Sequence, residues 1–152
     1  MDLSIIIPCH NLEHYIKPLL LSFQIIDYTD IEVEFIFVLD ACTDKTRGQI
    51  EQYMPLVDKP YYIYECDYHS CGLARNFGFE HSQGNYIWFV DGDDWIINPR
   101  VLNDTIIKMA EDNIPIIQIP FVSNFYNQKF YSMVWQYIYS RELICDIKFP
   151  EI

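Results

Sequence analysis

The sequence predicts an α/β fold, in which a mostly parallel sheet is covered by helices on both faces. The main observation is that short apolar runs typical of buried strands alternate four times with segments of helical periodicity. No internal repeat, low-complexity tract or linker interrupts this alternation. We therefore expect one domain over residues 1–152, which is long enough to bury about 70% of the surface of its unfolded chain.

The first strands and helices follow from the apolar pattern. Residues 3–8 predict a buried strand, and the apolar residues after it recur at helical spacing as far as Ile26. Pro18 lies inside this second pattern and would cost about 3 kcal/mol in a helix interior, so we expect the main helix to begin near it. Residues 33–39 predict a second buried strand, and Thr43 can cap the helix that follows.

The middle of the chain continues the same alternation. Residues 61–64 predict a third strand, Gly72 is expected to open a helix, and Gly84 is expected to close it. Residues 87–90 are apolar, β-branched or aromatic, and they predict a fourth strand that is buried on both faces.

The C-terminal part gives weaker signals. Asn98 followed by Pro99 is typical of a helix start, with a cap and then a first-turn proline. Two further strands are expected at residues 116–121 and 130–134, and a short helix is expected at residues 141–146.

Composition excludes several classes of protein. The net charge of -12 argues against a nucleic-acid partner, because phosphate binding needs clustered Lys and Arg. No apolar run is long enough for a transmembrane segment, and the first residues lack the features of a signal peptide. Five cysteines without a CxxC pair fit a reducing compartment. We expect a cytoplasmic protein that could lie peripherally on the inner face of the membrane. The aromatic surplus at residues 121–139 predicts a homo-oligomer.

The fourth predicted strand ends in a cluster of carboxylates that is the main candidate for chemistry. Asp91, Asp93 and Asp94 follow it within four residues. Two carboxylates about 4 Å apart repel by roughly 4 kcal/mol at an effective dielectric constant of 20, so a cation is expected between them. An oxygen-only ligand set suits Mg2+ or Mn2+. Residues 8–11, 40–43 and 91–94 should converge, because parallel strands place their carboxyl ends at one edge of the sheet.

Three common nucleotide or metal motifs do not fit. The chain has no GxGxxG after its first strand and no GxxxxGK[ST] motif, which argues against dehydrogenases and P-loop proteins. A calcium loop that began at Asp91 would place Trp95 and Leu102 where oxygen ligands are required.

Four segments in register carry a resemblance to a known family. They are PCHN at residues 8–11, LDACTDKT at 39–46, GLARNFG at 72–78 and YIWFVDGDDW at 86–95. Together they resemble the donor half of a family 2 glycosyltransferase with the A-type nucleotide-sugar fold. The resemblance implies a single Rossmann-like A-type domain that is short at its C-terminus, with a donor-binding half at residues 1–98 and a partial C-terminal part at 99–152.

The resemblance also implies a nucleotide site. Pro8, His10 and Asn11 match the family segment beside the nucleobase, and His10 stands where a stacking aromatic ring is common. Asp40 matches the aspartate that hydrogen-bonds the base, usually uracil. Leu39 replaces a frequent additional aspartate, and this departure leaves the identity of the base open.

The phosphate and metal residues follow in the same way. Arg75 is expected either to pair with a donor phosphate or to fix the aspartate loop. Asp91, Gly92 and Asp93 match the family's DxD motif. By that resemblance Asp93 ligates Mn2+ or Mg2+, Asp91 contacts the ribose or the metal's water shell, and Gly92 belongs to the nucleotide-sugar site.

The implied activity is transfer of a sugar, with inversion, from a nucleotide-diphosphate sugar to an unknown glycan, lipid or protein acceptor; a UDP-sugar is the expected donor. A divalent cation would stabilise the charge on the departing phosphate, and a general base would take the acceptor's proton. Residues 134–152 resemble the stretch that precedes the family's Glu-Asp base motif. We therefore expect the catalytic base beyond Ile152.

Two alternatives stay open at the level of sequence. The chain could be a catalytically incomplete remnant that binds a donor or a partner without turnover. It could also be a Mg2+-dependent phosphotransfer or nucleotidyl-transfer enzyme, which would release phosphate or pyrophosphate rather than free sugar.

Overall fold

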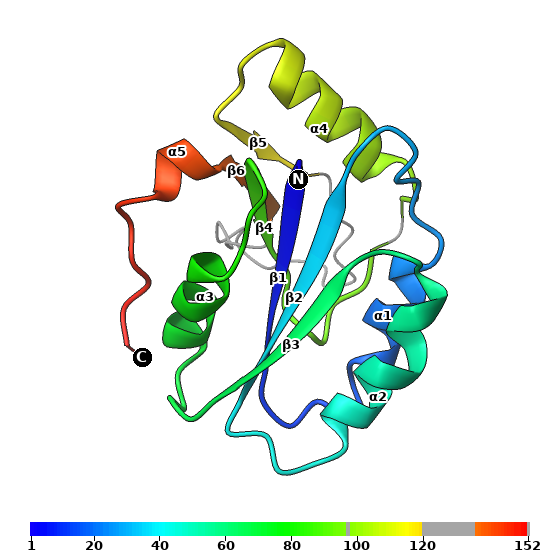
Figure 1. The fold of residues 1–152 in the computed structure, drawn as a ribbon, viewed down its shortest axis with the longest axis vertical. Coiled ribbons are helices and arrows are strands. Elements are labelled where there is room, and N and C mark those ends of the chain that lie inside the picture. Colours follow the sequence, from blue (N-terminus) through cyan, green and yellow to red (C-terminus); the bar gives the residue numbers. More distant parts are fainter. Residues whose placement is uncertain (97, 120–135, 152) are drawn as a thin grey trace, which may run out of the picture.

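The computed structural model describes residues 1–96, 98–119 and 136–151. The strand expected at residues 130–134 lies outside these ranges. The elements follow one another along the chain as shown in Figure 1. They are β1 (Leu3–Cys9), α1 (Lys17–Phe23), β2 (Val33–Asp40), α2 (Thr46–Tyr53), the 3-10 helix η1 (Met54–Leu56), β3 (Tyr61–Cys66), α3 (Cys71–Glu80), β4 (Tyr86–Phe89), α4 (Val101–Glu111), β5 (Ile116–Gln118), β6 (Tyr137–Ser140) and α5 (Arg141–Ile144).

The six strands form one sheet in the order β3-β2-β1-β4-β6-β5. β1 pairs in parallel with both β2 and β4, and β2 pairs in parallel with β3. β6 runs antiparallel to both β4 and β5. The predicted α/β class with a mostly parallel sheet is therefore confirmed, but β6 was not predicted from the sequence.

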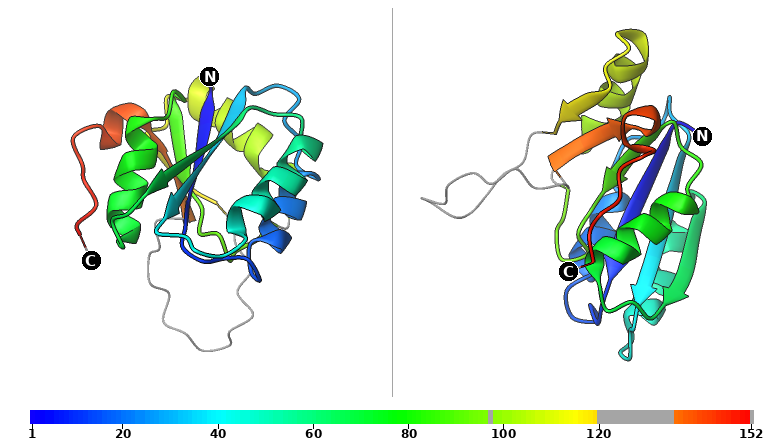
Figure 2. Two further views of the ribbon diagram at one scale, coloured as in Figure 1. Left: turned by 60° about the horizontal axis from the view of Figure 1, so that its bottom comes forward. Right: turned by 90° about the vertical axis from the view of Figure 1, so that its left-hand side faces the viewer.

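Helices cover both faces of the sheet, which explains why every residue of β1 and β2 is buried. Ile5 and Ile7 belong to the core on the side of α1, α2 and α4, whereas Ile6 belongs to a second core on the side of α3. Figure 2 shows α3 on one side of the sheet and α1 with α2 on the other. β3 is an edge strand and is only partly buried.

The helix boundaries agree with the capping signals in part. α1 has Pro18 in its first turn, as expected. α3 begins at Cys71, because the hydroxyl of Ser70 caps it by accepting a hydrogen bond from the Leu73 N–H at 3.3 Å. α3 ends at Glu80, well before Gly84, so the prediction that Gly84 closes the helix is wrong. Gly84 lies against the backbone of Ser4, where a Cβ atom would collide with the Ser4 nitrogen.

Two C-terminal elements differ from their predicted bounds. α4 begins at Val101, two residues after Pro99, and the Asn98 side chain accepts a hydrogen bond from the Arg100 N–H. β5 covers residues Ile116–Gln118 and is shorter than expected. The α5 helix lies where a short helix was predicted.

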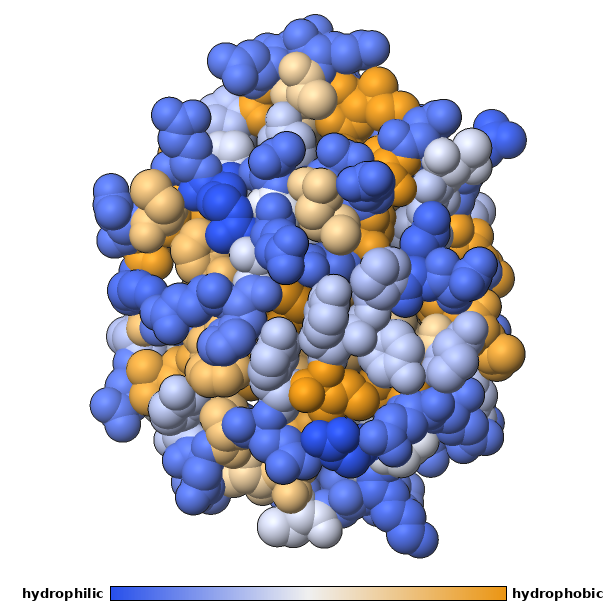
Figure 3. Space-filling view, in the orientation of Figure 1, coloured by the Kyte–Doolittle hydropathy of each residue, from blue (hydrophilic) through white to orange (hydrophobic). Residues whose placement is uncertain are grey.

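The surface is largely hydrophilic on the face shown in Figure 3, with smaller apolar areas between the polar side chains. All five cysteines are free thiols. In the part of the chain that the structure describes, no helix has the length and apolar character needed to cross a membrane.

Candidate functional site

The carboxyl ends of β1 and β2 are joined by polar contacts. His10 Nδ1 lies 2.7 Å from the carbonyl oxygen of Asp40. The side-chain oxygen of Asn11 accepts a hydrogen bond from the Thr43 N–H at 2.8 Å. Asp44 accepts hydrogen bonds from the Thr46 N–H and hydroxyl at the start of α2. The expected convergence of the first two strand ends is therefore present.

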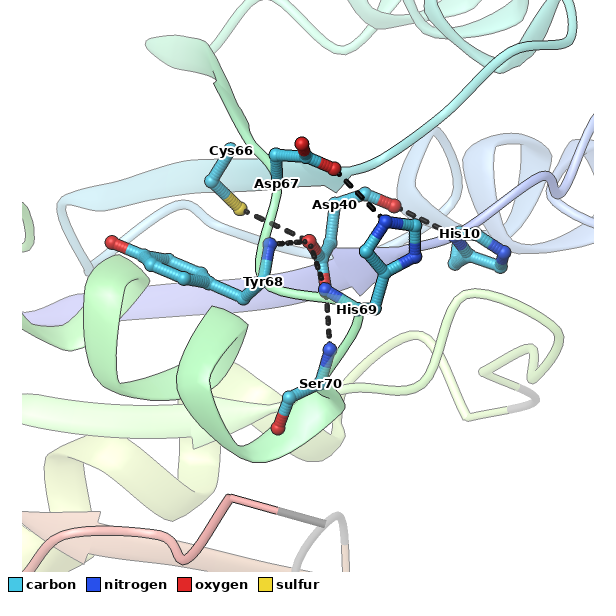
Figure 4. A network of polar contacts seen from close by, with 7 residues as sticks. All are labelled: His10, Asp40, Cys66, Asp67, Tyr68, His69 and Ser70. Carbon is cyan, nitrogen blue, oxygen red and sulfur yellow. Dashed lines mark hydrogen bonds and ion pairs between the residues drawn. The ribbon is translucent and has the colours of Figure 1, made fainter.

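Asp40 organises the loop that connects β3 to α3. Its Oδ1 accepts hydrogen bonds from the N–H groups of Tyr68 at 2.6 Å and His69 at 3.0 Å, and its Oδ2 accepts one from Ser70 at 2.7 Å (Figure 4). Burial raises the pKa of the Asp40 carboxyl, but the hydrogen bonds from Ser70, Tyr68 and His69 outweigh it, and the net pKa is lowered. Asp40 is therefore an ionised, 4% exposed anchor for this loop.

His69, in the loop between β3 and α3, lies opposite His10. Their ring centroids are 6.2 Å apart with the planes at 62°, and His69 Nε2 lies 3.0 Å from Asp67 Oδ1 (Figure 4). Asn11, Ala41 and His69 all have left-handed backbone, with φ values of 51°, 50° and 51°. Such backbone is uncommon for residues other than glycine and clusters at functional sites.

These loops enclose a pocket of about 290 Å3 at the carboxyl edge of the sheet. It is lined by Pro8, Cys9, His10, Asp40, His69, Ser70, Cys71 and Ala74. Sequence reasoning predicted Pro8, His10 and Asp40, but it missed the contribution of residues 69–71. The place of these residues in the chain could have indicated them, because the DYHSC loop follows the carboxyl end of the third parallel strand. Asn11 does not line the pocket and instead braces the neighbouring loop.

The acidic loop after β4 packs on the end of β1. Gly92 lies beside Leu12 and the end of β1, and a Cβ atom at this position would displace the end of the Leu12 side chain. Asp91 accepts a hydrogen bond from Arg75 Nη2 at 2.7 Å, and both side chains are partly buried, with 32% of Asp91 and 15% of Arg75 exposed. The structure thus shows a contact between Arg75 and the aspartate loop, and the role of Arg75 toward a donor phosphate stays a prediction.

Negative charge accumulates in this loop. Asp93 is exposed and Asp94 is half-buried. Burial, followed by the charges of Asp91 and Asp93, raises the pKa of Asp94 to about 6. Arg75 is the only cation that makes an ion pair with the loop within the described ranges.

A divalent cation fits the chemistry of this loop, although the described residues alone do not form a complete ligand set. Across residues 1–96, 98–119 and 136–151, no group of three or more His, Cys, Asp or Glu side chains is arranged to hold a metal ion. Mg2+ is commonly held by one or two carboxylates together with water and substrate phosphates. Asp91 and Asp93 offer carboxylate oxygens of this kind. Their charges, after burial, contribute to the raised pKa of Asp94, and a cation would offset this repulsion.

The fold and the pocket at the carboxyl edge of its parallel sheet define an α/β protein of the A-type glycosyltransferase fold. The structure of Staphylococcus aureus TarS matches 99% of this chain and 30% of that chain, with a TM-score of 0.84 and 27% identity. TarS 1–349 in complex with UDP-GlcNAc matches with a TM-score of 0.83 at 27% identity, over 99% of this chain and 49% of that chain. The mannosyltransferase PcManGT from Pyrobaculum calidifontis, in complex with GDP-Man and Mn2+, shares the fold at a TM-score of 0.79 and 16% identity, over 98% of this chain and 47% of that chain.

The family model described as Glycosyl transferase family 2 matches residues 4–150, and the chain belongs to that family. Poly(ribitol-phosphate) beta-N-acetylglucosaminyltransferase TarS of S. aureus is 31% identical over 119 residues, which are 78% of this chain and 21% of TarS. Glycosyltransferase GlyA of Streptococcus pneumoniae is 34% identical over 94 residues, which are 62% of this chain and 13% of GlyA. The chain thus spans about a fifth or less of the length of these relatives.

Proposed function

We propose that this chain is the donor-binding part of a glycosyltransferase that takes a sugar from a UDP-sugar with the help of Mn2+ or Mg2+. The observation that carries the proposal is that two features lie at the same edge of the sheet. They are the pocket built around Asp40 and the acidic loop that contains Asp91. The likeness to TarS, a structure of which contains UDP-GlcNAc, supports a uridine nucleotide. In this proposal residues 1–98 are the donor-binding half and residues 99–152 the start of the C-terminal part.

The pocket would hold the nucleobase. His10 is exposed at the pocket entrance, where its ring can stack on a base, and Pro8 forms part of the wall. Among the described residues, only the Ser70 N–H donates a hydrogen bond to Asp40 Oδ2, so this oxygen keeps a lone pair for a donor on the base. Asn11 would act indirectly, by holding the loop at Thr43 in place.

The acidic loop would hold the diphosphate side of the donor. Asp93 and Asp91 would be the cation ligands, with Gly92 allowing the close approach of their loop to β1. A bound divalent cation would stabilise the negative charge that develops on the departing diphosphate. Arg75 keeps Asp91 in position, and its guanidinium adds positive charge beside the same phosphates.

The acceptor's proton requires a general base, for which we propose residues beyond Ile152. The described residues 1–96, 98–119 and 136–151 supply the donor side, and the transfer is proposed to invert the anomeric centre. The acceptor, whether glycan, lipid or protein, the cytoplasmic location and the contact with another copy stay predictions.

The proposal is tested by calorimetric titration of the chain with UDP in the presence and absence of Mn2+, together with thermal unfolding. Ligand at 100 times its dissociation constant should add about 2.7 kcal/mol to the free energy of unfolding. Asp93→Asn should remove the part of this stabilisation that depends on Mn2+. Asp58→Asn is the matched control, because Asp58 is exposed, lies two residues after η1 and undergoes the same change of charge.

Full Mn2+-dependent binding in Asp93→Asn would rule out the proposed metal site. Binding of UDP and UDP-sugar without any release of free sugar would favour the donor-binding remnant. Release of phosphate or pyrophosphate in place of sugar would favour a phosphotransfer or nucleotidyl-transfer enzyme.

A further inference from the structure

The C-terminal strap, defined as residues 145–151, runs alongside α3 (Figures 1 and 2). The Asn76 side chain holds it by two paired hydrogen bonds. Asn76 Nδ2 donates to the Phe149 carbonyl oxygen at 2.9 Å, and the Phe149 N–H donates to Asn76 Oδ1 at 2.8 Å. Lys148 adds an ion pair with Glu80 at 2.6 Å. The strap is therefore fixed to α3 at a defined register.

The Phe149 ring fills the space between the end of β4 and the Arg75 guanidinium. Its centroid lies 5.0 Å from that of Phe89, with the two rings almost perpendicular at 82°. The Arg75 Cζ atom lies 5.4 Å from the centroid of the Phe149 ring. Such a cation–π contact contributes about 0.5–2 kcal/mol, with the larger value where the cation is desolvated.

In the part of the chain that the structure describes, one hydrogen bond fixes the orientation of Arg75. Its Nη2 donates to Asp91, whereas its buried Nε has no hydrogen-bond partner among the described residues. The guanidinium plane is therefore set by one hydrogen bond at its end and by the face of the Phe149 ring. Without that ring, Arg75 could rotate toward a partner for Nε and release Asp91.

We propose that Phe149, held by Asn76, is a positioning residue for the donor site: it orients Arg75, which in turn orients Asp91. The C-terminal strap and the acidic loop are thus coupled through a continuous set of contacts from Asn76 to Asp91. The consequence for the donor rests on the proposed function. The coupling itself is a property of the ligand-free protein.

The substitution that tests this is Phe149→Leu, which keeps an apolar side chain against Phe89 but removes the ring face under Arg75. The dissociation constant of UDP with Mn2+ should rise about threefold to tenfold. Phe149→Tyr keeps the ring and should restore the affinity of the original chain.

A matched control is available on the same helix. Phe79, near the C-terminal end of α3 and one helical turn beyond Arg75, places its ring 4.9 Å from the Arg141 Cζ atom. Phe79→Leu removes an equivalent contact between a ring and a guanidinium, and it should lower stability while leaving the affinity for UDP with Mn2+ unchanged. A purely structural role of Phe149 would make the two variants behave alike.

A second measurement needs no ligand. The coupling between Arg75 and Asp91 is obtained from urea unfolding of Arg75→Met, Asp91→Asn and the double variant. We express this coupling as a ratio of unfolding equilibrium constants. When the same variants are made in a chain that carries Phe149→Leu, the ratio should fall several-fold toward 1. If Phe149→Leu does not fold, Asn76→Ser replaces it, because that change releases the strap without altering the ring.

The two measurements distinguish failure of the positioning role from failure of the proposed function. An unchanged Arg75–Asp91 coupling in both Phe149→Leu and Asn76→Ser overturns the positioning role, whatever the chain binds. A reduced coupling in a chain that does not bind UDP with Mn2+ supports the positioning role and overturns the proposed function.

Discussion

Gly72 of α3 lies directly beneath the carbonyl oxygen of Pro150, and a Cβ atom on Gly72 would collide with that oxygen. The same Cβ would lie 3.3 Å from the Phe149 Cβ atom. The absence of a side chain at residue 72 thus allows the C-terminal strap to approach α3.

The first prediction is that Gly72→Ala destabilises the protein by about 1–3 kcal/mol, because the strap backbone must move to relieve the overlap. The free energy of unfolding in urea measures it. Gly48→Ala is the matched control, since Gly48 lies in α2 with no atom within 4 Å of an added Cβ. That change should stabilise the protein by about 0.5–1 kcal/mol through helix propensity. Equal effects of the two substitutions would contradict the close approach of the strap.

The second prediction concerns the pH dependence introduced by Asp94, whose pKa is raised to about 6 by burial and by Asp91 and Asp93. In the unfolded chain an aspartate has a pKa of about 3.9. Between about pH 4 and pH 6 the folded state therefore binds more protons than the unfolded state, and the free energy of unfolding falls as the pH rises.

Asp94→Asn should remove this loss. The variant should be more stable than the original chain by about 1 kcal/mol at pH 8, a value reduced for the partial exposure of the carboxylate. The difference should vanish near pH 4. Urea unfolding with a chelator present, at several pH values, provides the measurement, and Asp58→Asn provides the control. A stability difference that does not change with pH would show that Asp94 is not the group responsible.

The third prediction is that Asp40→Asn loosens the loop at residues 67–70. An amide has one acceptor oxygen in place of two, so at least one of the N–H groups from Tyr68, His69 and Ser70 loses its partner. Hydrogen bonds to a charged group contribute about 1.5–3 kcal/mol, and we expect a loss of stability in this range at pH 7. Hydrogen exchange of these amides should become faster.

The pH profile gives an independent check on Asp40. Its pKa is lowered in the folded state, so its stabilising contribution is present above about pH 4 and is lost as the pH falls through the folded-state pKa. Asp40→Asn should lack this acid-dependent loss. Asp67→Asn, in the same loop but with an 83% exposed side chain, should retain it. Retention of the acid-dependent loss in Asp40→Asn would assign it to another carboxyl group.

The fourth prediction follows from the proposed stacking of His10 on the nucleobase. His10→Ala should weaken UDP binding about tenfold or more, because stacking of a base on an aromatic side chain contributes about 1–3 kcal/mol. His10→Phe should preserve most of the affinity. His14→Ala is the control, since His14 is exposed and does not line the pocket. Calorimetry with UDP in the presence of Mn2+ measures all three, and undiminished binding by His10→Ala would exclude the stacking role.

Much of the fold could be predicted because the decisive information is local. The apolar runs of β1 and β2 and the proline at the start of α1 are visible in the sequence, and strands buried on both faces must have helices on both sides. The order of the strands in the sheet could not be predicted from local sequence patterns. β6 is a four-residue strand between β4 and β5, and its antiparallel pairing depends on contacts far apart in the sequence.

Only part of the candidate site could likewise be predicted from the sequence. The ends of parallel strands must meet, so the grouping of His10, Asp40 and Asp91 could be expected. The partners of their side chains could not. The first N–H group that donates to the Asp40 side chain is 28 residues later in the chain, and Arg75 is supported by a ring 74 residues away. Such pairings follow from the packing of the whole chain and leave no periodic pattern in the sequence.

The left-handed backbone at Asn11, Ala41 and His69 has a consequence for the order in which the protein loses its structure on heating. A residue with a Cβ atom gives up roughly 1–2 kcal/mol in this conformation, and Ala41 has no polar side chain to compensate. Its N–H is held by the carbonyl oxygen of Cys66 at 2.8 Å, so the strained turn persists only while β3 stays docked. β3 is the edge strand, and when it frays Ala41 should relax at once. The proposed nucleotide binding should therefore be lost at temperatures where most of the secondary structure is still intact.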